Sequence, residues 1–205
     1  MLNRARKIFI RGAREVAVGK ERVSRITGCC KMIKLVLDCE TSGLTLPSLA
    51  DIDRQPRITE LAVAVFVRGS LVSEHSWLFN PGVQLSDKII KITGITNEML
   101  CDQPSFAERI PEIRALFENA DQLFAHNANF DVSCMKYELQ RAGCNDFPWP
   151  RDIFCTVQEY VHEFGHRPTL ADLYLKKMGL PLQQAHRALS DVRALVDILK
   201  QEILL

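Results

Sequence analysis

Asp38 and Glu40, two carboxylates separated by one residue, are the first side chains in this sequence whose spacing suits chemistry. They follow an apolar, β-branched run at residues 33–37, which is typical of a buried strand that ends at Asp38. Because residues i and i+2 of a strand project from the same face, both carboxylates can point at one site. Hard cations such as Mg²⁺ take oxygen ligands, so the pair indicates a metal site. A solvated acidic turn explains the same two residues, and that alternative stays open.

A third acid, Asp131, follows a short apolar run at residues 122–125 and lies where the next helix is expected to begin. Metal binding is one role for a carboxylate in this place. The other role is structural, because an acid at a helix N-terminus caps the helix or interacts favourably with its dipole. Asp131 is therefore informative only together with the other acids.

His186 and Asp191 lie near the end of the sequence, five positions apart. That spacing is close to one and a half helical turns, so the two side chains cannot share one helical face. We expect His186 to precede the helix on a loop and Asp191 to reach the same site from the helix. Taken alone, this histidine is equally compatible with a surface residue or with a contact at the start of the helix.

The residues that must position these side chains include four segments with strand character. After the first run, residues 41–47 are rich in Gly, Ser and Pro and predict a loop. Residues 58–67 and 71–79 flank the turn Arg68-Gly69-Ser70, which predicts an antiparallel hairpin that pairs with the first strand. Residues 122–125 form the fourth run.

Helical patterns dominate the remainder of the sequence. The expected helices cover residues 86–92, 105–119, 129 or 131 to 142, 155–163, 169–178 and 187–199. Antiparallel strands come first, and strand and helix alternate afterwards. This order predicts an α/β fold in which helices flank a mixed sheet.

The composition indicates one folded domain. A chain of 205 residues, 47% of them hydrophobic and 25% charged, is long enough for one full core and too short for two ordinary ones. No apolar run approaches the roughly 18 residues of a membrane span. The seven cysteines form no CxxC pair, so we expect reduced thiols in a reducing compartment, the cytoplasm.

Residues 1–31 differ from the rest and form a basic N-terminal extension to the domain at residues 32–205. They contain nine Lys and Arg but two Glu, a balance of +7, which leaves −6 for the domain. Arg4, Lys7, Arg11 and Arg14 recur at helical spacing. A mitochondrial presequence, a nucleic-acid arm, a surface anchor and a loosely ordered segment upstream of a true start at Met32 all fit this pattern.

The acids and the histidine fall within stretches that resemble the DEDDh exonucleases. This group of the ribonuclease H-like superfamily includes the proofreading subunit of bacterial DNA polymerase III. The matching stretches are LVLDCETSGL at residues 35–44, HNANFD at 126–131 and HRALSD at 186–191, with weaker similarity in ITGITNEML at 92–100. Together they extend the resemblance over residues 33–199 and occur in the order that the family has.

The resemblance implies a ribonuclease H-like fold with a mixed five-stranded sheet, in which the first three strands are antiparallel and the others parallel. It also implies release of nucleoside 5′-monophosphates from the 3′ end of a single strand or a frayed duplex. DNA is the favoured substrate, with a role in proofreading, repair or replication and a polymerase as possible partner. A 3′→5′ exoribonuclease is the main alternative. A non-catalytic nucleic-acid-binding or polymerase-accessory module is a further one.

The resemblance further implies a role for each residue of the site. Asp38 would bridge two Mg²⁺ ions, for which Mn²⁺ would substitute, with Glu40 and Asp191 on one ion and Asp131 on the other. His186 would be the general base, and its ordinary pKa near 6.5 suits that role. The predicted substrate contacts are Thr41, Ser42, Gly43, Leu44, Ile95, Asn127, Phe130 and His186. For Ile95 and Phe130, plain core packing explains the apolar side chain equally well.

Two irregular segments stand outside these motifs. Residues 47–56 are longer than the tight connection expected of compact family members, and a lid, a partner contact and a surface loop all fit them. Residues 146–152 are irregular and contain Trp149 between two prolines. We expect this tryptophan to pack on the core rather than to stack on a base.

Overall fold

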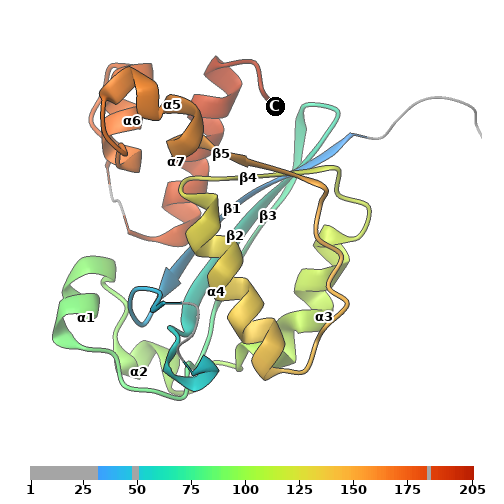
Figure 1. The fold of residues 1–205 in the computed structure, drawn as a ribbon, viewed down its shortest axis with the longest axis vertical. Helices are drawn as coiled ribbons and strands as arrows, with labels where there is room; N and C mark the ends of the chain where they lie inside the picture. Colours follow the sequence, from blue (N-terminus) through green and yellow to red (C-terminus); the bar gives the residue numbers. More distant parts are fainter. Residues whose placement is uncertain (1–31, 48–50, 184–185) are drawn as a thin grey trace, which may run out of the picture. The chain divides into compact units, whose positions relative to one another are not determined.

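A five-stranded mixed sheet forms the centre of the molecule (Figure 1). The computed structural model describes residues 32–47, 51–183 and 186–205. The strands are β1 (Ile33–Thr41), β2 (Ile58–Val67), β3 (Ser70–Leu78), β4 (Gln122–Ala125) and β5 (Asp152–Cys155), in the spatial order β3-β2-β1-β4-β5. The pairs β1–β2 and β2–β3 are antiparallel, whereas β1–β4 and β4–β5 are parallel. This topology confirms the predicted fold.

The hairpin between β2 and β3 turns at Arg68 and Gly69, within the predicted segment Arg68-Gly69-Ser70, and Ser70 already belongs to β3. Arg68 and Gly69 both have positive φ, at 53° and 78°. Left-handed geometry at both positions is typical of a type I′ turn, whose twist matches that of the two strands. The turn therefore sets the pairing of Val67 with Ser70 and of Phe66 with Leu71, and an irregularity between Val65 and Phe66 shifts the register by one residue for the rest of the hairpin.

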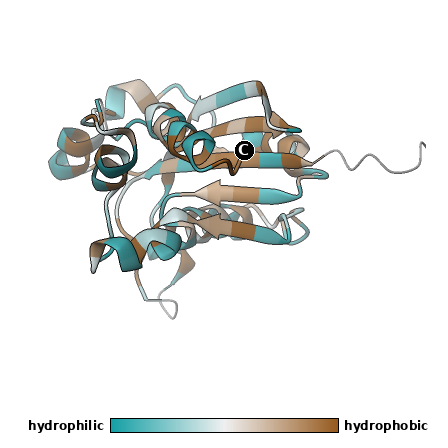
Figure 2. Ribbon diagram, turned by 90° about the horizontal axis from the view of Figure 1, so that it is seen from above, coloured by the Kyte–Doolittle hydropathy of each residue, from teal (hydrophilic) through white to brown (hydrophobic). Residues whose placement is uncertain are grey.

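Helices cover both faces of the sheet, as the alternation along β1 requires. Leu35 and Leu37 pack against α3 (Phe106–Phe117) and α4 (Ala128–Arg141), whereas Val36 packs against α7 (Ala188–Gln201). Hydrophobic residues accordingly concentrate on the strands, while the helices alternate between hydrophobic and hydrophilic segments (Figure 2). Because successive residues of a strand face opposite sides, Asp38 and Glu40 lie on the α7 face with Val36.

The remaining helices are short and are defined by their caps. They are α1 (Asp87–Thr93), α2 (Asn97–Leu100), α5 (Thr156–Phe164) and α6 (Leu170–Met178), with a 3₁₀ turn at Ile52–Arg54. Ser105 and Thr169 form capping boxes that start α3 and α6. Gly94 ends α1 in the left-handed conformation, at a φ of 70°. Helix α2 was not predicted, because four residues contain too little periodicity to be recognised.

One strand boundary was predicted wrongly, and one strand was not predicted. β1 does not end at Asp38 but continues to Thr41, since Glu40 and Thr41 still pair with Glu60 and Ile58 of β2. Residues 152–155, predicted as the end of an irregular segment and the start of a helix, form β5. Within the described part of the chain this strand pairs with β4 alone, and four residues are too few for an alternating pattern to identify it.

The described part of the 47–56 segment is a packed loop. Gln55 is buried, accepts a hydrogen bond from the Leu46 amide at 3.0 Å and donates to the Leu46 carbonyl at 3.3 Å. The Arg141 guanidinium on α4 donates to the carbonyls of Ile52 and Gln55 at 2.6 and 2.7 Å. These bonds hold the loop against α4.

Trp149 packs as predicted, with its ring centroid 5.0 Å from that of Phe147 and 5.7 Å from that of Phe117. No helix in the described ranges is both long and apolar enough to cross a membrane. The basic extension at residues 1–31 lies outside the described residues.

Candidate active site

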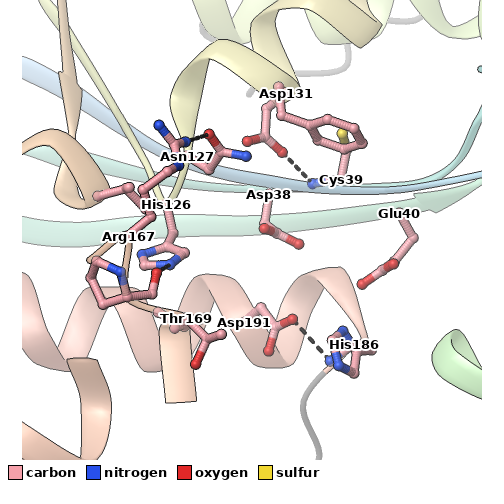
Figure 3. A pocket seen from close by; sticks show the side chains of 14 residues that line it. Asp38, Cys39, Glu40, His126, Asn127, Asp131, Arg167, Thr169, His186 and Asp191 are labelled. Atoms are coloured by element: carbon pink, nitrogen blue, oxygen red, sulfur yellow. Dashed lines mark hydrogen bonds between the residues drawn. The ribbon is translucent and has the colours of Figure 1, made fainter. Parts of the chain in front are cut away.

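A cavity of about 440 Å³ opens at the carboxyl ends of β1 and β4, beside the N-termini of α4 and α7 (Figure 3). The carboxyl ends of parallel strands are where α/β folds usually bind ligands. The residues that line the cavity are Asp38, Cys39, Glu40, His126, Asn127, Phe130, Asp131, Val157, Arg167, Pro168, Thr169, Leu170, His186 and Asp191. The four predicted acids and the predicted histidine therefore surround one cavity, although they come from three separate parts of the chain.

Asp131 reaches the cavity from the first turn of α4. It is only 2% exposed, and its Oδ1 accepts a hydrogen bond from the Cys39 amide at 3.0 Å. The cap residue of α4 is Asn127, in the left-handed region at a φ of 63°, and no side chain caps this helix. The carboxylate of Asp131 is thus held against β1 by the residue between Asp38 and Glu40.

Asp191 reaches the cavity from α7 and is tied to His186. Its Oδ2 accepts a hydrogen bond from the backbone N–H of His186 at 2.9 Å, and His186 has a positive φ of 69°. Its Oδ1 is buried without a hydrogen-bond partner in the described part of the chain. A buried carboxylate oxygen of this kind requires a partner, and a cation supplies one.

Three of these residues form a group with metal-binding geometry. One ligand atom each from Glu40, His186 and Asp191 lies within 4.8 Å of the other two. Figure 3 shows Asp131 on the opposite side of β1 from Asp191 and His186, with Asp38 between them. The acids thus converge on Asp38 from both faces of the sheet.

Burial raises the pKa of every acid in the cavity, and repulsion from the other cavity acids raises the pKa of Asp38 and Glu40 further. Burial first, and then the charges of Asp131, Asp191 and Glu40, hold the pKa of Asp38 well above its ordinary value. Burial and the charge of Asp191 raise the pKa of Glu40 to about 8, and burial raises that of Asp131 to about 7. Burial also raises the pKa of Asp191.

These pKa shifts mean that the four carboxylates cannot all be ionised near neutral pH unless a cation compensates their charge. The donor set consists of carboxylate oxygens, one of them unpartnered and buried. Hard divalent cations select such ligands. The residues present therefore fit divalent metal ions.

Glu60 and Arg187 form an ion pair that was not predicted from the sequence. The Glu60 carboxylate is 2% exposed and accepts from Nε and Nη2 of Arg187, both at 3.0 Å, and from the Ala188 amide at 3.1 Å. It thereby fixes the start of α7 to β2, directly beside Glu40, its cross-strand neighbour. The signal was the single charged residue in a strand that is otherwise uncharged and mostly apolar, because a buried charge needs a partner.

His126 is hydrogen-bonded to two other segments, on the side of the cavity away from His186. The Pro168 carbonyl can only accept, so Nε2 of His126 donates to it at 3.1 Å, and Nδ1 accepts from the Thr156 hydroxyl at 2.9 Å. Burial lowers the pKa of His126 to about 4, which keeps the ring neutral. Next to Pro168, Nη2 of Arg167 donates to the Asn127 Oδ1 at 2.6 Å.

Three of the predicted substrate contacts, Asn127, Phe130 and His186, line the cavity. Phe130 also packs partly against the core. Ile95 has no exposed surface and packs with Leu85 and Leu100. The structure therefore places Ile95 in a small core beneath α1 and α2, outside the cavity lining.

The predicted contacts at Thr41, Ser42, Gly43 and Leu44 follow the end of β1. The Thr41 hydroxyl donates to the Gly43 carbonyl at 2.6 Å, and the Ser42 hydroxyl accepts from the Arg57 amide at 2.9 Å. Leu44 is 82% exposed. The first two side chains shape the turn after β1, and Leu44 projects into solvent.

Comparison with known families identifies a nuclease domain. A model of the exonuclease family named RNase T matches residues 35–199. The chain is 32% identical over 164 residues to the DNA polymerase III PolC-type protein of Thermotoga petrophila, covering 80% of this chain and 11% of that protein. It is 31% identical over 165 residues to the DNA polymerase III subunit epsilon of Treponema pallidum, covering 78% of this chain and 72% of the subunit. The chain thus spans about a tenth of the PolC-type relative.

Solved structures show the same fold. A structure of exonuclease X in complex with 5′ overhanging duplex DNA is 26% identical, with a TM-score of 0.57 over 82% of this chain and 91% of that one. Exonuclease I is 19% identical, with a TM-score of 0.67 over 83% of this chain and 40% of that one, and this similarity concerns the fold alone.

Proposed function

Because this chain belongs to the RNase T exonuclease family, we propose that it is a metal-dependent 3′→5′ exonuclease of the DEDDh type that removes nucleoside 5′-monophosphates from DNA. The observation that carries the proposal is the convergence of Asp38, Glu40, Asp131, Asp191 and His186 on one cavity. The names of the polymerase III relatives, and the DNA bound to exonuclease X, favour DNA as the substrate. The same relatives support a replicative polymerase as partner.

Two Mg²⁺ ions are the proposed cofactors, with Mn²⁺ as a substitute. Asp38 is placed to serve both ions, since it lies between the other acids; Glu40 and Asp191 would hold one ion and Asp131 the other. When bound, such ions stabilise the charge on the attacking and leaving oxygens of an in-line displacement. Asp131 keeps Oδ2 for this role, because the Cys39 amide occupies only Oδ1.

His186 is the proposed general base. Its side chain is exposed at the mouth of the cavity, and its backbone is fixed through Asp191. A neutral imidazole there can accept the proton of the attacking water. The positive φ of His186 is a costly conformation for a residue other than glycine.

The 3′-terminal nucleotide would lie between the turn after β1 and the start of α4. In the proposal, backbone groups of Thr41, Ser42 and Gly43 contact it, and Leu44 covers the base or sugar. Asn127 and Phe130 contact it from the cavity wall. A single strand or a frayed 3′ end is the favoured substrate, because a paired terminal nucleotide must first unpair from its complement, which costs free energy.

The substrate assay uses three 5′-labelled substrates: single-stranded DNA, a duplex with a mismatched 3′ end, and RNA of the same sequence. With Mg²⁺ or Mn²⁺ we expect stepwise shortening of both DNAs from the 3′ end, faster than that of RNA. Asp38→Ala and EDTA abolish the reaction, whereas Asp102→Ala, which removes an exposed acid outside the cavity, does not. Equal degradation by wild type and Asp38→Ala refutes the catalytic assignment, and faster loss of RNA refutes the DNA preference.

A further inference from the structure

Arg167 is the one Lys or Arg among the residues that line the cavity. Its side chain is exposed, and Nη2 donates to Asn127 at 2.6 Å. Within the described residues, its Nε and Nη1 donors have no hydrogen-bond partner. A guanidinium that is anchored through one nitrogen and free at the others is arranged to bind a further acceptor, and phosphate oxygens match its planar donors well.

The segment that carries Arg167 is held at several points. The neighbouring Pro168 carbonyl accepts from His126, and Thr169 begins α6 with a capping box. On the opposite side, Asn127 uses its amide oxygen for Arg167 and makes no side-chain cap to α4. Arg167 is therefore fixed relative to the acids, which an unsupported arginine on a surface loop would not be.

The position of Arg167 decides which phosphate it can contact. In an in-line displacement, the attacking water and the leaving oxygen lie on opposite sides of the phosphorus. In the proposed reaction His186 marks the side of the water, and the leaving oxygen is the 3′ oxygen of the strand that remains. Figure 3 shows Arg167 and Asn127 on one side of Asp38, with Glu40 and His186 on the other. The retained strand would therefore leave the cavity past Arg167.

We infer, on the basis of the proposed function, that Arg167 binds the phosphate on the 5′ side of the scissile one, in the strand that is retained. The cavity is otherwise rich in acids, which repel a polyanion. Arg167 supplies a positive charge at the point where the retained strand extends out of the cavity. It is thus a substrate-binding residue that recognises a second phosphate rather than the reacting one.

The test compares two dinucleotides that differ by one phosphate, dTdT with a free 5′ hydroxyl and the same molecule with a 5′ phosphate. The 5′ phosphate stands in for the next phosphate of a longer strand. For the wild type we expect it to raise kcat/KM about tenfold, as one charge-assisted contact allows. In Arg167→Ala this ratio falls to about one, and Arg167→Lys keeps part of it. Arg151→Ala, which removes an exposed arginine at the far end of β5, retains the wild-type ratio.

The outcomes separate the inference from the proposed function. If Arg167 only holds Asn127 in position, its loss lowers kcat/KM equally for both dinucleotides. The ratio of the two kcat/KM values then stays at the wild-type level, which overturns the inference. A wild-type ratio near one also overturns it, while the exonuclease proposal stands. If the wild type cleaves neither dinucleotide nor any longer strand, the proposed function itself has failed.

Discussion

At the scale of single residues, two roles must be distinguished for His186. Its ring lies close enough to Glu40 and Asp191 to serve as a metal ligand or as a general base. We assign it the role of base. A ligand is needed for metal affinity, whereas a base is needed only for the chemical step. The two roles therefore differ in what the loss of the imidazole changes.

We predict that His186→Ala lowers kcat by about 10²- to 10⁴-fold, the usual contribution of a general base. The dissociation constant for Mn²⁺, measured by calorimetry, changes less than about threefold because the four carboxylates are intact. The matched comparison is Asp191→Asn, which removes a proposed ligand and weakens Mn²⁺ binding. If His186→Ala instead weakens Mn²⁺ binding as much as Asp191→Asn, and excess metal restores its rate, His186 is a ligand.

Some residues of the site could be predicted from the sequence, and others could not. Asp38 and Glu40 could be recognised because strand geometry makes i and i+2 neighbours, and the three motifs supplied Asp131, Asp191 and His186. Glu60 and Arg187 contact one another across 127 positions, and no local pattern predicts such a contact. Arg167 was missed for the same reason, since only the folded chain brings it to Asn127.

At the scale of elements, the catalytic use of α7 depends on how its first turn is fixed to the sheet. Two Arg–Glu pairs join α7 to the sheet, and both are bidentate: Arg187 with Glu60 and Arg193 with Glu74. In the first pair the Glu60 side chain is 3% exposed and that of Arg187 44%, whereas in the second pair the Glu74 side chain is 26% exposed and that of Arg193 59%. Solvent screens the second pair, so the first should matter more.

We predict that Glu60→Gln destabilises the protein by about 2 kcal/mol, because it removes a buried charge that accepts hydrogen bonds from the half-exposed Arg187 side chain and from the Ala188 amide. The melting temperature would fall by about 4–8 °C. Since α7 positions His186 and Asp191, kcat should fall about tenfold with little change in KM. Glu74→Gln is the matched control, at about 0–1 kcal/mol and with kcat unchanged. Equal effects of the two substitutions on kcat would show that the Glu60 pair has no special role.

Elements with strong periodicity or clear caps were predicted well, and the others were not. Ser105 and Thr169 start α3 and α6 near the expected residues, and the Arg68-Gly69 turn lies where predicted. β1 was predicted too short because its last residues are polar, yet they stay in the sheet through pairing with β2. β5 also forms through long-range pairing, and its four residues are too few for a sequence pattern to predict a strand.

At the scale of the whole molecule, the acidic cavity costs stability when no cation is bound. The folded state holds protons on Glu40 and Asp131, with pKa values of about 8 and 7, that the unfolded chain has released by the same pH. A carboxyl group whose pKa is raised on folding lowers stability as pH rises from its ordinary value to the raised one. Stability of the metal-free protein should therefore decrease between pH 6.5 and 8.5.

We predict that in EDTA the melting temperature is lower at pH 8.5 than at pH 6.5, by about 2–4 °C for each kcal/mol of lost stability. Mg²⁺ should narrow this gap, because it stabilises the ionised form that predominates at the higher pH. Glu40→Gln should also narrow the gap in EDTA, since it removes one of the raised groups. Thermal unfolding at the two pH values checks this, and a gap unaffected by both changes would contradict the assigned cluster.

The order in which nucleotides leave a strand tests the central claim most directly. The substrate is a single-stranded tract of dA that ends in one 3′-terminal dT, incubated with Mg²⁺ and sampled for released mononucleotides by mass spectrometry. Our account predicts that thymidine 5′-monophosphate appears first and deoxyadenosine 5′-monophosphate afterwards, and that Asp38→Ala releases neither. Release of adenine nucleotides first, of 3′-monophosphates, or of the same products by Asp38→Ala would contradict a 3′→5′ exonuclease centred on these four acids.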